Sequence, residues 1–448
     1  MRVAVVGGGI SGLAAAWLLD RRYSVTLFES GEQAGGHSNT VPVAEPTREG
    51  GEREVPVDTG FIVYNRHNYP NLSAFFDSLE LATAPSDMSF AASLEQGRIE
   101  YAGDHPRKLF GQPINLIRPS HWRMIAEILR FNRCAAAWLD EEGDQGETVE
   151  QFLTAFGLSP VLAERYLLPM AAAIWSAPLA EIRDFPARSL LAFFRNHGLL
   201  QIRDRPHWRT VRGGSRQYVR RILGDLRGAV RTATPVLGVR PDQDGVALRH
   251  AAGEERFDQV ILAVHADQAR ELLAGAHPAA ERLLADFRFS RNRAYLHSDP
   301  RLMPRRRRLW ASWNYLSAGR SEASRRVSVS YWMNRLQPLE SSRDYFVSLN
   351  PLHEPDPDLC WYQTEYTHPV LDAAALRVQQ ALPTFQGREG IWFAGAWTRY
   401  GFHEDGMRSA VEIANALGVK APWQTGDEAA VMMQTDASPA IHPVGQGG

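Results

Sequence analysis

The chain has 448 residues and a formal net charge of −2, with 44% hydrophobic and 22% charged residues. The length predicts two or three domains, and the charge excludes a general attraction to nucleic acid. Two cysteines, Cys134 and Cys360, with no C-x-x-C pair, argue against a disulfide framework and favour a reducing, cytoplasmic location. We expect no signal peptide, because the first predicted strand starts at residue 2, and no membrane span, because no apolar run approaches about 20 residues.

A glycine-rich turn between two predicted strands opens the chain. In order, the sequence predicts a buried strand over residues 3–6, a turn with Gly7, Gly9 and Gly12, a helix over 13–19, and a strand over 24–28 that ends in Glu29. Gly7 permits a tight turn, Gly9 lets a pyrophosphate approach the backbone, and Gly12 allows the helix to pack on the strand. The helix N-terminus favours the pyrophosphate's charge, and Glu29 can accept hydrogen bonds from ribose hydroxyls. The stretch therefore predicts an adenine dinucleotide site.

Glycines recur at the predicted strand ends that follow. In chain order, the further predicted elements are Gly35-Gly36-His37, a polar loop over 42–54, a strand over 55–64 interrupted at Gly60, strands over 232–239 and 257–264, a strand over 391–394 followed by Gly395, and a glycine-rich segment over 401–407 that leads into a last helix.

This order predicts an α/β protein with a discontinuous dinucleotide-binding domain, made of residues 1–80, 205–275 and 385–420. Residues 81–204, mostly helical in pattern, and residues 276–384, with aromatic-rich strands, would form an inserted α+β substrate-binding domain. Residues 421–448 are small, polar and unpatterned, which predicts a disordered tail.

A nucleotide-binding domain assembled from both chain ends and a central segment resembles the FAD-binding domain of the flavin-containing amine oxidase and phytoene desaturase superfamily. The resemblance implies a Rossmann-like FAD-binding fold with one noncovalently bound FAD, since neither cysteine falls in a flavin motif. By their positions in the family's motifs, the residues assigned to the cofactor are Gly7, Gly9, Ser11, Gly12, Glu29, Gly35, Gly36, His37, Thr59, Gly60, Val236, Gly395, Trp397, Gly406 and Met407. In this assignment Val236 contacts adenine, and Gly406 and Met407 lie beside the ribityl chain and flavin ring.

One branch of flavoproteins is similar over longer segments. These segments are VDTGFIVYN (57–65), the run from 297 to 315, YWMNRLQPL (331–339) and FAGAWTRYGFHEDGMRSA (393–410). They resemble a group of bacterial and plant flavoproteins that are encoded beside cyclopropane-fatty-acid-synthase-like methyltransferases and are linked to lipid modification. The resemblance implies a lipid or fatty acyl substrate and a functional link to an acyl-chain methyltransferase.

Three departures from the superfamily pattern bear on the chemistry. His37 stands where the family has an arginine, which removes a permanently charged bidentate donor. A Gly-Glu pair of amine oxidases is replaced by Gly395-Ala396-Trp397. Most amine oxidases hold a lysine near flavin N5, but the matching residues 291–335 contain none, and the only lysines are Lys108 and Lys420. These departures disfavour plain amine oxidation.

Four residues are candidates for catalysis. His403 comes first, because it lies in the glycine-rich segment that should face the flavin and a histidine pKa can be tuned near neutrality. Glu404 adjoins it, and an alternative is that these residues only shape the flavin loop. Tyr64 and His297 are weaker candidates, each equally consistent with a packed or hydrogen-bonded structural residue.

A run of four arginines, Arg305, Arg306, Arg307 and Arg308, forms either a solvated face or a peripheral contact with anionic phospholipid at the inner face of the membrane, supported by the basic amphipathic segment 121–133. No base-stacking or metal-ligand motif accompanies it.

We therefore predict an FAD-dependent oxidoreductase that desaturates an unsaturated or methylated fatty acyl chain by hydride transfer to flavin N5. An amine or amino-acid oxidase, a double-bond isomerase and a non-enzymatic lipid- or partner-binding flavoprotein are the alternatives.

Overall fold

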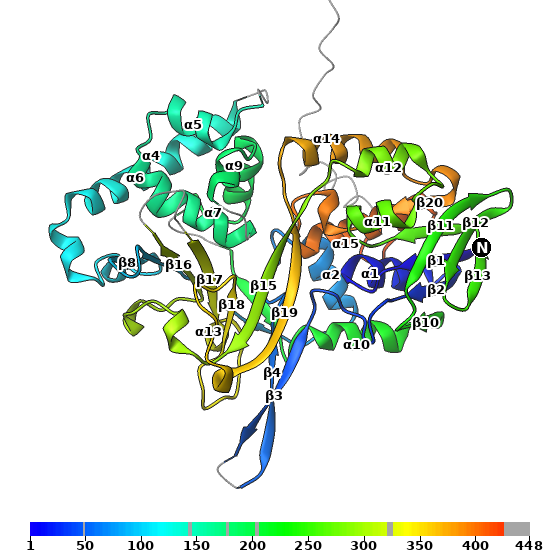
Figure 1. The fold of residues 1–448 in the computed structure, drawn as a ribbon, viewed down its shortest axis with the longest axis horizontal. Helices are drawn as coiled ribbons and strands as arrows, with labels where there is room; N and C mark the ends of the chain where they lie inside the picture. Colours follow the sequence, from blue (N-terminus) through cyan, green and yellow to red (C-terminus); the bar gives the residue numbers. More distant parts are fainter. Residues whose placement is uncertain (48–49, 142–145, 176–178, 202–205, 320–325, 425–448) are drawn as a thin grey trace, which may run out of the picture.

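The computed structural model of the chain describes residues 1–47, 50–141, 146–175, 179–201, 206–319 and 326–424. Two halves lie side by side in it (Figure 1), one built on a parallel sheet and the other on a mixed sheet with a helical lobe. The predicted tail, apart from residues 421–424, lies outside the described ranges.

A parallel sheet forms the centre of the first half. In spatial order its strands are β10 (Ala229–Arg231), β2 (Ser24–Phe28), β1 (Arg2–Val6), β14 (Gln259–Leu262) and β20 (Ile391–Phe393). Neighbours in this sheet are therefore drawn from both chain ends and from the middle. The predicted α/β fold with a discontinuous Rossmann-like domain is confirmed.

Alternate residues of β1 pack into different cores, because side chains on a strand point to opposite faces. Val3 and Val5 pack with a layer of helices, whereas Ala4 and Val6 pack with an antiparallel meander. The helices on the first face are α1 (Ile10–Leu19), α2 (Pro70–Ser78), α10 (Arg216–Asp225) and α15 (His403–Ala416). The meander and its neighbours are β11 (Val236–Asp242), β12 (Gly245–His250), β13 (Gly253–Phe257), α11 (Ala266–Leu272) and α12 (Pro278–Leu284).

The mixed sheet of the second half runs from β19 at one edge to β8 at the other. In spatial order its strands are β19 (Cys360–Pro369), β15 (Phe289–His297), β18 (Phe346–Leu349), β17 (Arg326–Trp332), β16 (Trp313–Ala318), β7 (Phe90–Leu94) and β8 (Ile99–Ala102). Two distant parts of the chain, residues 90–102 and 289–369, thus form one sheet. The long strands β15 and β19 lie beside the first half (Figure 1).

A helical lobe packs above this sheet (Figure 1), and short helices complete the second half. The lobe consists of α4 (Pro119–Asp140), α5 (Val149–Ala155), α6 (Pro160–Leu162), a π-helical turn (Ala163–Leu167), α7 (Leu168–Trp175), α8 (Leu179–Arg183) and α9 (Ala187–Asn196). The remaining short helices are α3 (Pro106–Leu109), α13 (Met333–Leu336) and α14 (Ala373–Ala381). Among the described residues, no helix combines the length and apolar character needed to cross a bilayer.

The predicted loop over residues 42–54 is wrong, because this segment forms most of a β-ribbon. Strands β3 (Thr40–Pro46) and β4 (Glu52–Asp58) pair antiparallel, with Val43, Val55 and Val57 buried. Prolines within both strands hid the alternating pattern, and a two-stranded ribbon tolerates them because both strands are edges. Two further strands, β5 (Tyr64–Asn65) and β6 (Thr83–Pro85), flank β9 (Trp208–Val211).

A buried carboxylate at the end of β4 ties the halves together. Asp58 accepts hydrogen bonds from Thr40 Oγ1 at 2.5 Å and from the amide of Ser215, at the start of α10, at 2.9 Å. It also accepts from Gln337 Nε2, in the second half, at 2.7 Å. Burial outweighs these bonds and raises the pKa of Asp58 to about 6. The clamp fixes the ribbon against the start of α10 and the end of α13, at the point where Thr59 and Gly60 follow.

Candidate functional site

The first glycine turn is tightly closed on one side and open on the other. Gly7 has a φ of 105°, which favours glycine, and a Cβ on Gly12 would lie 1.9 Å from the Gly7 carbonyl oxygen. A Cβ on Gly9 would meet nothing within 4 Å. The helix therefore packs against the strand at Gly12, while Gly9 faces open space where a ligand can approach the backbone. Ser11 is buried behind the turn, where a Cβ on Gly406 would lie 2.7 Å from its Oγ.

The second glycine turn packs directly on the first. The Gly35 amide donates to the Gly8 carbonyl oxygen at 2.8 Å, and a Cβ on Gly36 would lie 3.3 Å from the Gly9 Cα. Glu29 lies at the carboxyl end of β2, where it accepts from the Gly8 amide at 2.7 Å. Two glycine turns, an open backbone face and a carboxylate at the sheet edge form a cradle that fits a dinucleotide pyrophosphate and ribose. We call residues 7–12, Glu29 and Gly36 the pyrophosphate cradle.

Val236, Thr59 and Gly60 continue the cradle in two directions. Val236 is partly buried at the start of β11, and the amide of Thr234, just before it, donates to the Glu29 carbonyl oxygen at 2.9 Å. On the other side, a Cβ on Gly60 would lie 2.2 Å from the His37 carbonyl oxygen. Thr59 Oγ1 lies 2.7 Å from the Tyr366 hydroxyl. The predicted adenine side and flavin side thus lie at opposite ends of the second glycine turn.

The C-terminal cofactor candidates meet the site mainly through their backbone. Trp397 is 2% exposed; its indole Nε1 donates to the Val264 carbonyl oxygen and its ring packs against Phe287. Met407 is fully buried in the core between α1 and α15. The Gly395 amide donates to Ser409 Oγ at 3.0 Å, which holds β20 against α15. Their side chains stabilise the turn that precedes α15, so any cofactor contact there uses main-chain atoms.

Beside this turn lies a cluster of aromatic side chains, which we call the histidine–tyrosine cluster. Its members are His37, His265, Tyr366 and His368, with ring centroids 4.8 Å from His37 to Tyr366, 5.5 Å to His368 and 6.3 Å to His265. Only His37 was predicted from the sequence. His265 follows the end of a buried strand, and Tyr366 and His368 alternate along β19, so strand ends and period-two spacing were the available signals.

The imidazoles of this cluster are neutral at pH 7. Burial lowers the pKa of His368 to about 4 and that of His37 well below its usual range. The Nε2 atom of His37 is buried and has no hydrogen-bond partner among the described residues. A buried polar atom without a partner is costly, so a ligand atom at this position would satisfy it. Together with the open cradle, this orphaned nitrogen shows that the residues present fit a bound FAD.

His403 lies in the site, where its neighbours cover it in part. Its ring stacks on Phe61, with centroids 3.9 Å apart, and its Nε2 lies 3.1 Å from Ser38 Oγ. Burial lowers the pKa of His403 to about 3, so the ring is neutral at pH 7 and is a weak base there. It occupies the first position of α15 and orders the turn beside the second glycine pair.

The other three catalytic candidates have structural partners. Both carboxylate oxygens of Glu404 accept hydrogen bonds from the start of α2, two from Asn71 and one from the Leu72 amide. Tyr64 is 1% exposed and packs on Phe76. His297 lies at the far end of β15, roughly 26 Å of strand from Phe289 beside the cluster. Its two ring nitrogens face Ser348 Oγ and the Asp299 amide.

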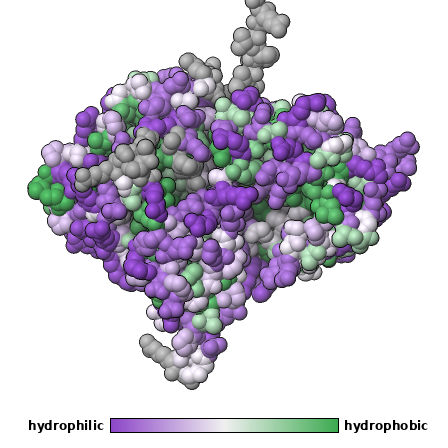
Figure 2. Space-filling model, in the orientation of Figure 1, coloured by the Kyte–Doolittle hydropathy of each residue, from purple (hydrophilic) through white to green (hydrophobic). Residues whose placement is uncertain are grey.

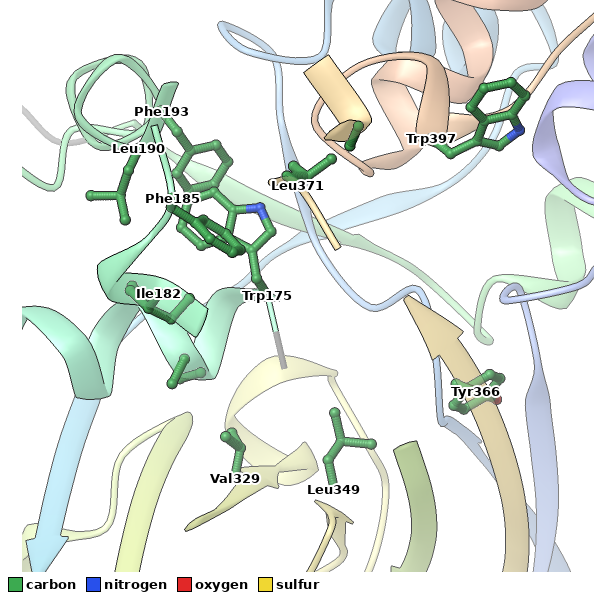
Figure 3. Close-up of a cluster of buried hydrophobic side chains, with 14 of the residues drawn as sticks. Trp175, Ile182, Phe185, Leu190, Phe193, Val329, Leu349, Tyr366, Leu371 and Trp397 are labelled. Carbon is green, nitrogen blue, oxygen red and sulfur yellow. The ribbon is translucent and has the colours of Figure 1, made fainter. Parts of the chain in front are cut away.

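An apolar pocket opens between the helical lobe and the turn before α15. Its lining residues are Trp175, Phe185, Ser189, Leu190, Leu371, Leu376, Gln379, Arg399 and Tyr400. Figure 3 shows Trp175, Phe185 and Phe193 gathered on the lobe side, with Leu371 facing them. Phe193 stacks on Phe402 at 4.8 Å between centroids, and Phe402 directly precedes α15. The pocket wall thus reaches the glycine-rich segment, and none of the described lining residues is acidic.

The parallel sheet, the double glycine turn and the inserted second half define a two-domain dinucleotide flavoprotein. The sequence model of the flavin containing amine oxidoreductase family matches residues 10–291, more than half of the chain. The chain therefore belongs to this family of FAD-dependent oxidoreductases, and its cofactor is FAD. When bound, FAD supplies a two-electron acceptor, while the protein binds, orients and desolvates the reactants.

Individual relatives share the fold at low sequence identity. The fatty acid isomerase that produces conjugated linoleic acid (CLA) in P. acnes superimposes with a TM-score of 0.64 at 14% identity, covering 93% of this chain and 98% of the isomerase. Cyclohexylamine oxidase from Brevibacterium oxydans gives 0.61 at 17% identity, covering 93% and 99%. An L-amino acid dehydrogenase of Synechocystis is 23% identical over 271 residues, which span 58% of this chain and 55% of that protein. The chain thus matches about half the length of that dehydrogenase.

Proposed function

We propose that the chain is an FAD-dependent oxidoreductase that desaturates an unsaturated or methylated fatty acyl chain. The observation that carries the proposal is the apolar pocket, which Trp175 and Phe185 line from the helical lobe and Tyr400 lines from the turn before α15. Behind Trp175, the ring of Phe193 packs on Trp175 and on Phe402. A hydrocarbon group that packs against such apolar side chains gains about 25 cal/mol per Å² of apolar surface removed from water. A methylated acyl chain would be supplied by an acyl-chain methyltransferase, the functional link that the sequence predicts.

The charges around the pocket favour an acyl substrate over an amine. Arg399 is the charged lining residue, and its guanidinium donates to Glu412 Oε1 at 2.9 Å. The carboxylate of a free fatty acid could share this guanidinium, whereas none of the described lining residues offers a carboxylate to an ammonium group. Neither lysine supports amine chemistry: Lys108 pairs with Asp104 on α3, and Lys420 follows the end of α15.

The neutral imidazoles limit how the protein can accept the proton that desaturation releases from the substrate. Desaturation removes a hydride, which goes to the flavin, and a proton, and it leaves a carbon–carbon double bond. A histidine whose pKa lies near 3 or 4 is a weak base, so His403 and His368 would orient groups by hydrogen bonding and the proton would leave to water.

Anaerobic reduction of the bound flavin tests the proposal. The purified FAD-loaded protein is mixed with a panel of free fatty acids, methylated fatty acids, phospholipids, primary amines and L-amino acids, and loss of oxidised-flavin absorbance is followed. We expect acyl compounds to bleach the flavin and amines to leave it oxidised. Bleaching by amines or amino acids alone would overturn the proposal in favour of an amine or amino-acid oxidase.

Two further outcomes separate the remaining alternatives. Conversion of an unsaturated acid to a positional isomer without net flavin reduction would identify a double-bond isomerase, a possibility supported by the shared fold of the P. acnes enzyme. Tight lipid binding with neither bleaching nor isomerisation would identify a non-enzymatic lipid-binding flavoprotein.

Within the panel, Arg399→Met should raise the KM for free fatty acids about tenfold and leave that for neutral esters unchanged.

A further inference from the structure

Most of the large hydrophobic side chains that the described residues expose lie on one protrusion. Those residues are Ile114, Leu116, Ile117, Trp122 and Leu129. They belong to the 3₁₀ helix η1 (Pro113–Ile117) and to the first turns of α4. Ile117 is 76% exposed and Leu116 is 54% exposed. Figure 2 shows apolar surface gathered at the left edge, where Figure 1 places the segment between β8 and α4. We call these five residues the apolar tip.

The tip is held rigidly in its exposed position. The Trp122 indole donates to the Leu116 carbonyl oxygen at 2.9 Å, and its ring packs on Phe110 with centroids 4.7 Å apart. Asn115 is fully buried behind η1 and donates to the Glu100 carbonyl oxygen at 2.9 Å. Because these contacts hold the segment in place, its apolar side chains stay exposed to the solvent. A rigid apolar protrusion of this kind marks an interaction surface.

The surroundings of the tip are basic, although the whole chain is slightly acidic. Residues 104–133 carry six basic side chains, at positions 107, 108, 118, 123, 130 and 133, against two acidic ones. Both acids are already in ion pairs, Asp104 with Lys108 at 2.6 Å and Glu127 with Arg123 at 3.0 Å. The segment therefore has a net charge of +4 by this count, whereas the chain has −2.

The four-arginine run lies beside the same end of the molecule. Its backbone is anchored on β8, because the Arg305 amide donates to the buried Glu100 carboxylate at 2.8 Å. The Leu309 side chain fills the space next to Gly111, just before η1. Arg306 pairs with Glu100 at 2.5 Å and Arg307 with Asp344 at 2.7 Å. Arg305 and Arg308 are exposed and have no ion pair among the described residues.

We propose that the apolar tip inserts into the interfacial region of an anionic lipid bilayer, with Arg118, Arg305 and Arg308 contacting the headgroup phosphates. Aliphatic and tryptophan side chains enter the headgroup–acyl boundary, and basic residues around them are attracted to the anionic surface. A hydrophobic protein partner would not require the basic rim. The proposal needs no lipid substrate, so it stands or falls separately from the desaturase activity.

Vesicle flotation of the full FAD-loaded chain tests the apolar part. Vesicles of phosphatidylcholine alone are compared with vesicles of equal parts phosphatidylcholine and phosphatidylglycerol. We expect binding to the anionic vesicles, and we expect the double variant Leu116→Ser and Ile117→Ser to weaken it more than about tenfold. Leu237→Ser is the matched control, because Leu237 is 49% exposed on β11, away from the tip, and should bind as wild type. Flavin absorbance and thermal unfolding verify that each variant folds.

Charge variants test the basic part. Arg305→Gln with Arg308→Gln should weaken binding to anionic vesicles about tenfold, and high salt should shrink that difference. The control pair, Arg220→Gln with Arg270→Gln, removes two exposed arginines of the first half and should change little. Absence of wild-type binding, or unchanged binding by the Leu116 and Ile117 variant, would overturn the proposal. Dimers in sedimentation that this variant converts to monomers would instead assign the tip to self-association.

Discussion

The pyrophosphate cradle and the histidine–tyrosine cluster lie on either side of the second glycine turn, and they are built in opposite ways. The cradle uses backbone atoms and missing side chains: Gly9 faces open space and Gly36 packs on it. The cluster uses large side chains that strand β19 and the segment after β14 bring to His37. The cradle would hold the pyrophosphate and ribose of the cofactor, and the cluster would present neutral, hydrogen-bonding groups beside it.

This difference predicts different sensitivities to substitution. At Gly7 and Gly12 of the cradle a single added carbon meets a main-chain oxygen, which cannot move without disturbing the sheet. In the cluster a changed side chain alters hydrogen bonding while the surrounding strands keep their places. Substitution of a packed glycine in the cradle should therefore abolish FAD binding, whereas substitutions in the cluster should change the reaction rate by smaller steps.

The largest expected effect is that of Gly12→Ala in the cradle. The new Cβ would lie 1.9 Å from the Gly7 carbonyl oxygen, so α1 must move off β1. We expect a loss of about 3 kcal/mol in unfolding free energy and no FAD in the purified protein. Flavin absorbance and urea unfolding measure both.

The matched control for this substitution is Gly224→Ala in α10, where the same carbon meets nothing within 4 Å. Removing a glycine from a helix should stabilise the protein by up to about 1 kcal/mol and leave FAD bound. Wild-type FAD content in Gly12→Ala would contradict the assigned packing role of Gly12.

A second effect, which leaves FAD bound, concerns Glu404, whose carboxylate caps the start of α2 from α15. Burial raises the pKa of Glu404 from 4.5 to about 7. Because the folded state holds this proton more tightly than the unfolded state, the contribution to stability is full below about pH 4.5 and is lost as the pH rises to about 7, by about 3 kcal/mol. The contributions of Asp58 and Asp405 to folding stability also fall as the pH rises, because each of these groups has a pKa raised to about 6.

Glu404→Gln should flatten this dependence, as urea unfolding at pH 5 and pH 8 would show. The variant cannot lose a proton in this range, so its stability at the two pH values should differ less than that of the wild type. The exposed Glu340→Gln is the control and should keep the wild-type difference. An unchanged difference in Glu404→Gln would mean that the carboxylate titrates as it does in solution.

The contrast also explains what could be predicted from the sequence. The cradle is local, since Gly7, Gly12 and Glu29 lie within one strand–helix–strand unit, and their spacing alone indicated it. The cluster is not local: Tyr366 and His368 reach His37 only through the register of β19 on β15, in which Asn292 pairs with Tyr366. No spacing near residue 37 encodes that register. The predicted amphipathic segment 121–133 contains Trp122 and Leu129 of the apolar tip, but the exposed residues of η1 were not predicted, because exposure depends on which neighbours the fold supplies.

The smallest expected effect is that of His403→Gln on the pH dependence of flavin reduction. The wild-type imidazole has a pKa of about 3, so it stays neutral between pH 6 and pH 8 and contributes no ionisation there. Replacing it removes the stacking on Phe61 and the contact with Ser38, which should slow reduction by no more than about tenfold and cost about 1 kcal/mol of stability. The measurement is the anaerobic reduction rate with the fastest compound of the panel, at several pH values. Parallel profiles for wild type and variant are expected. An inflection between pH 6 and pH 8 that disappears in His403→Gln would show that His403 moves a proton in the reaction, and the cluster side of the second glycine turn would then be a catalytic centre rather than a positioning surface.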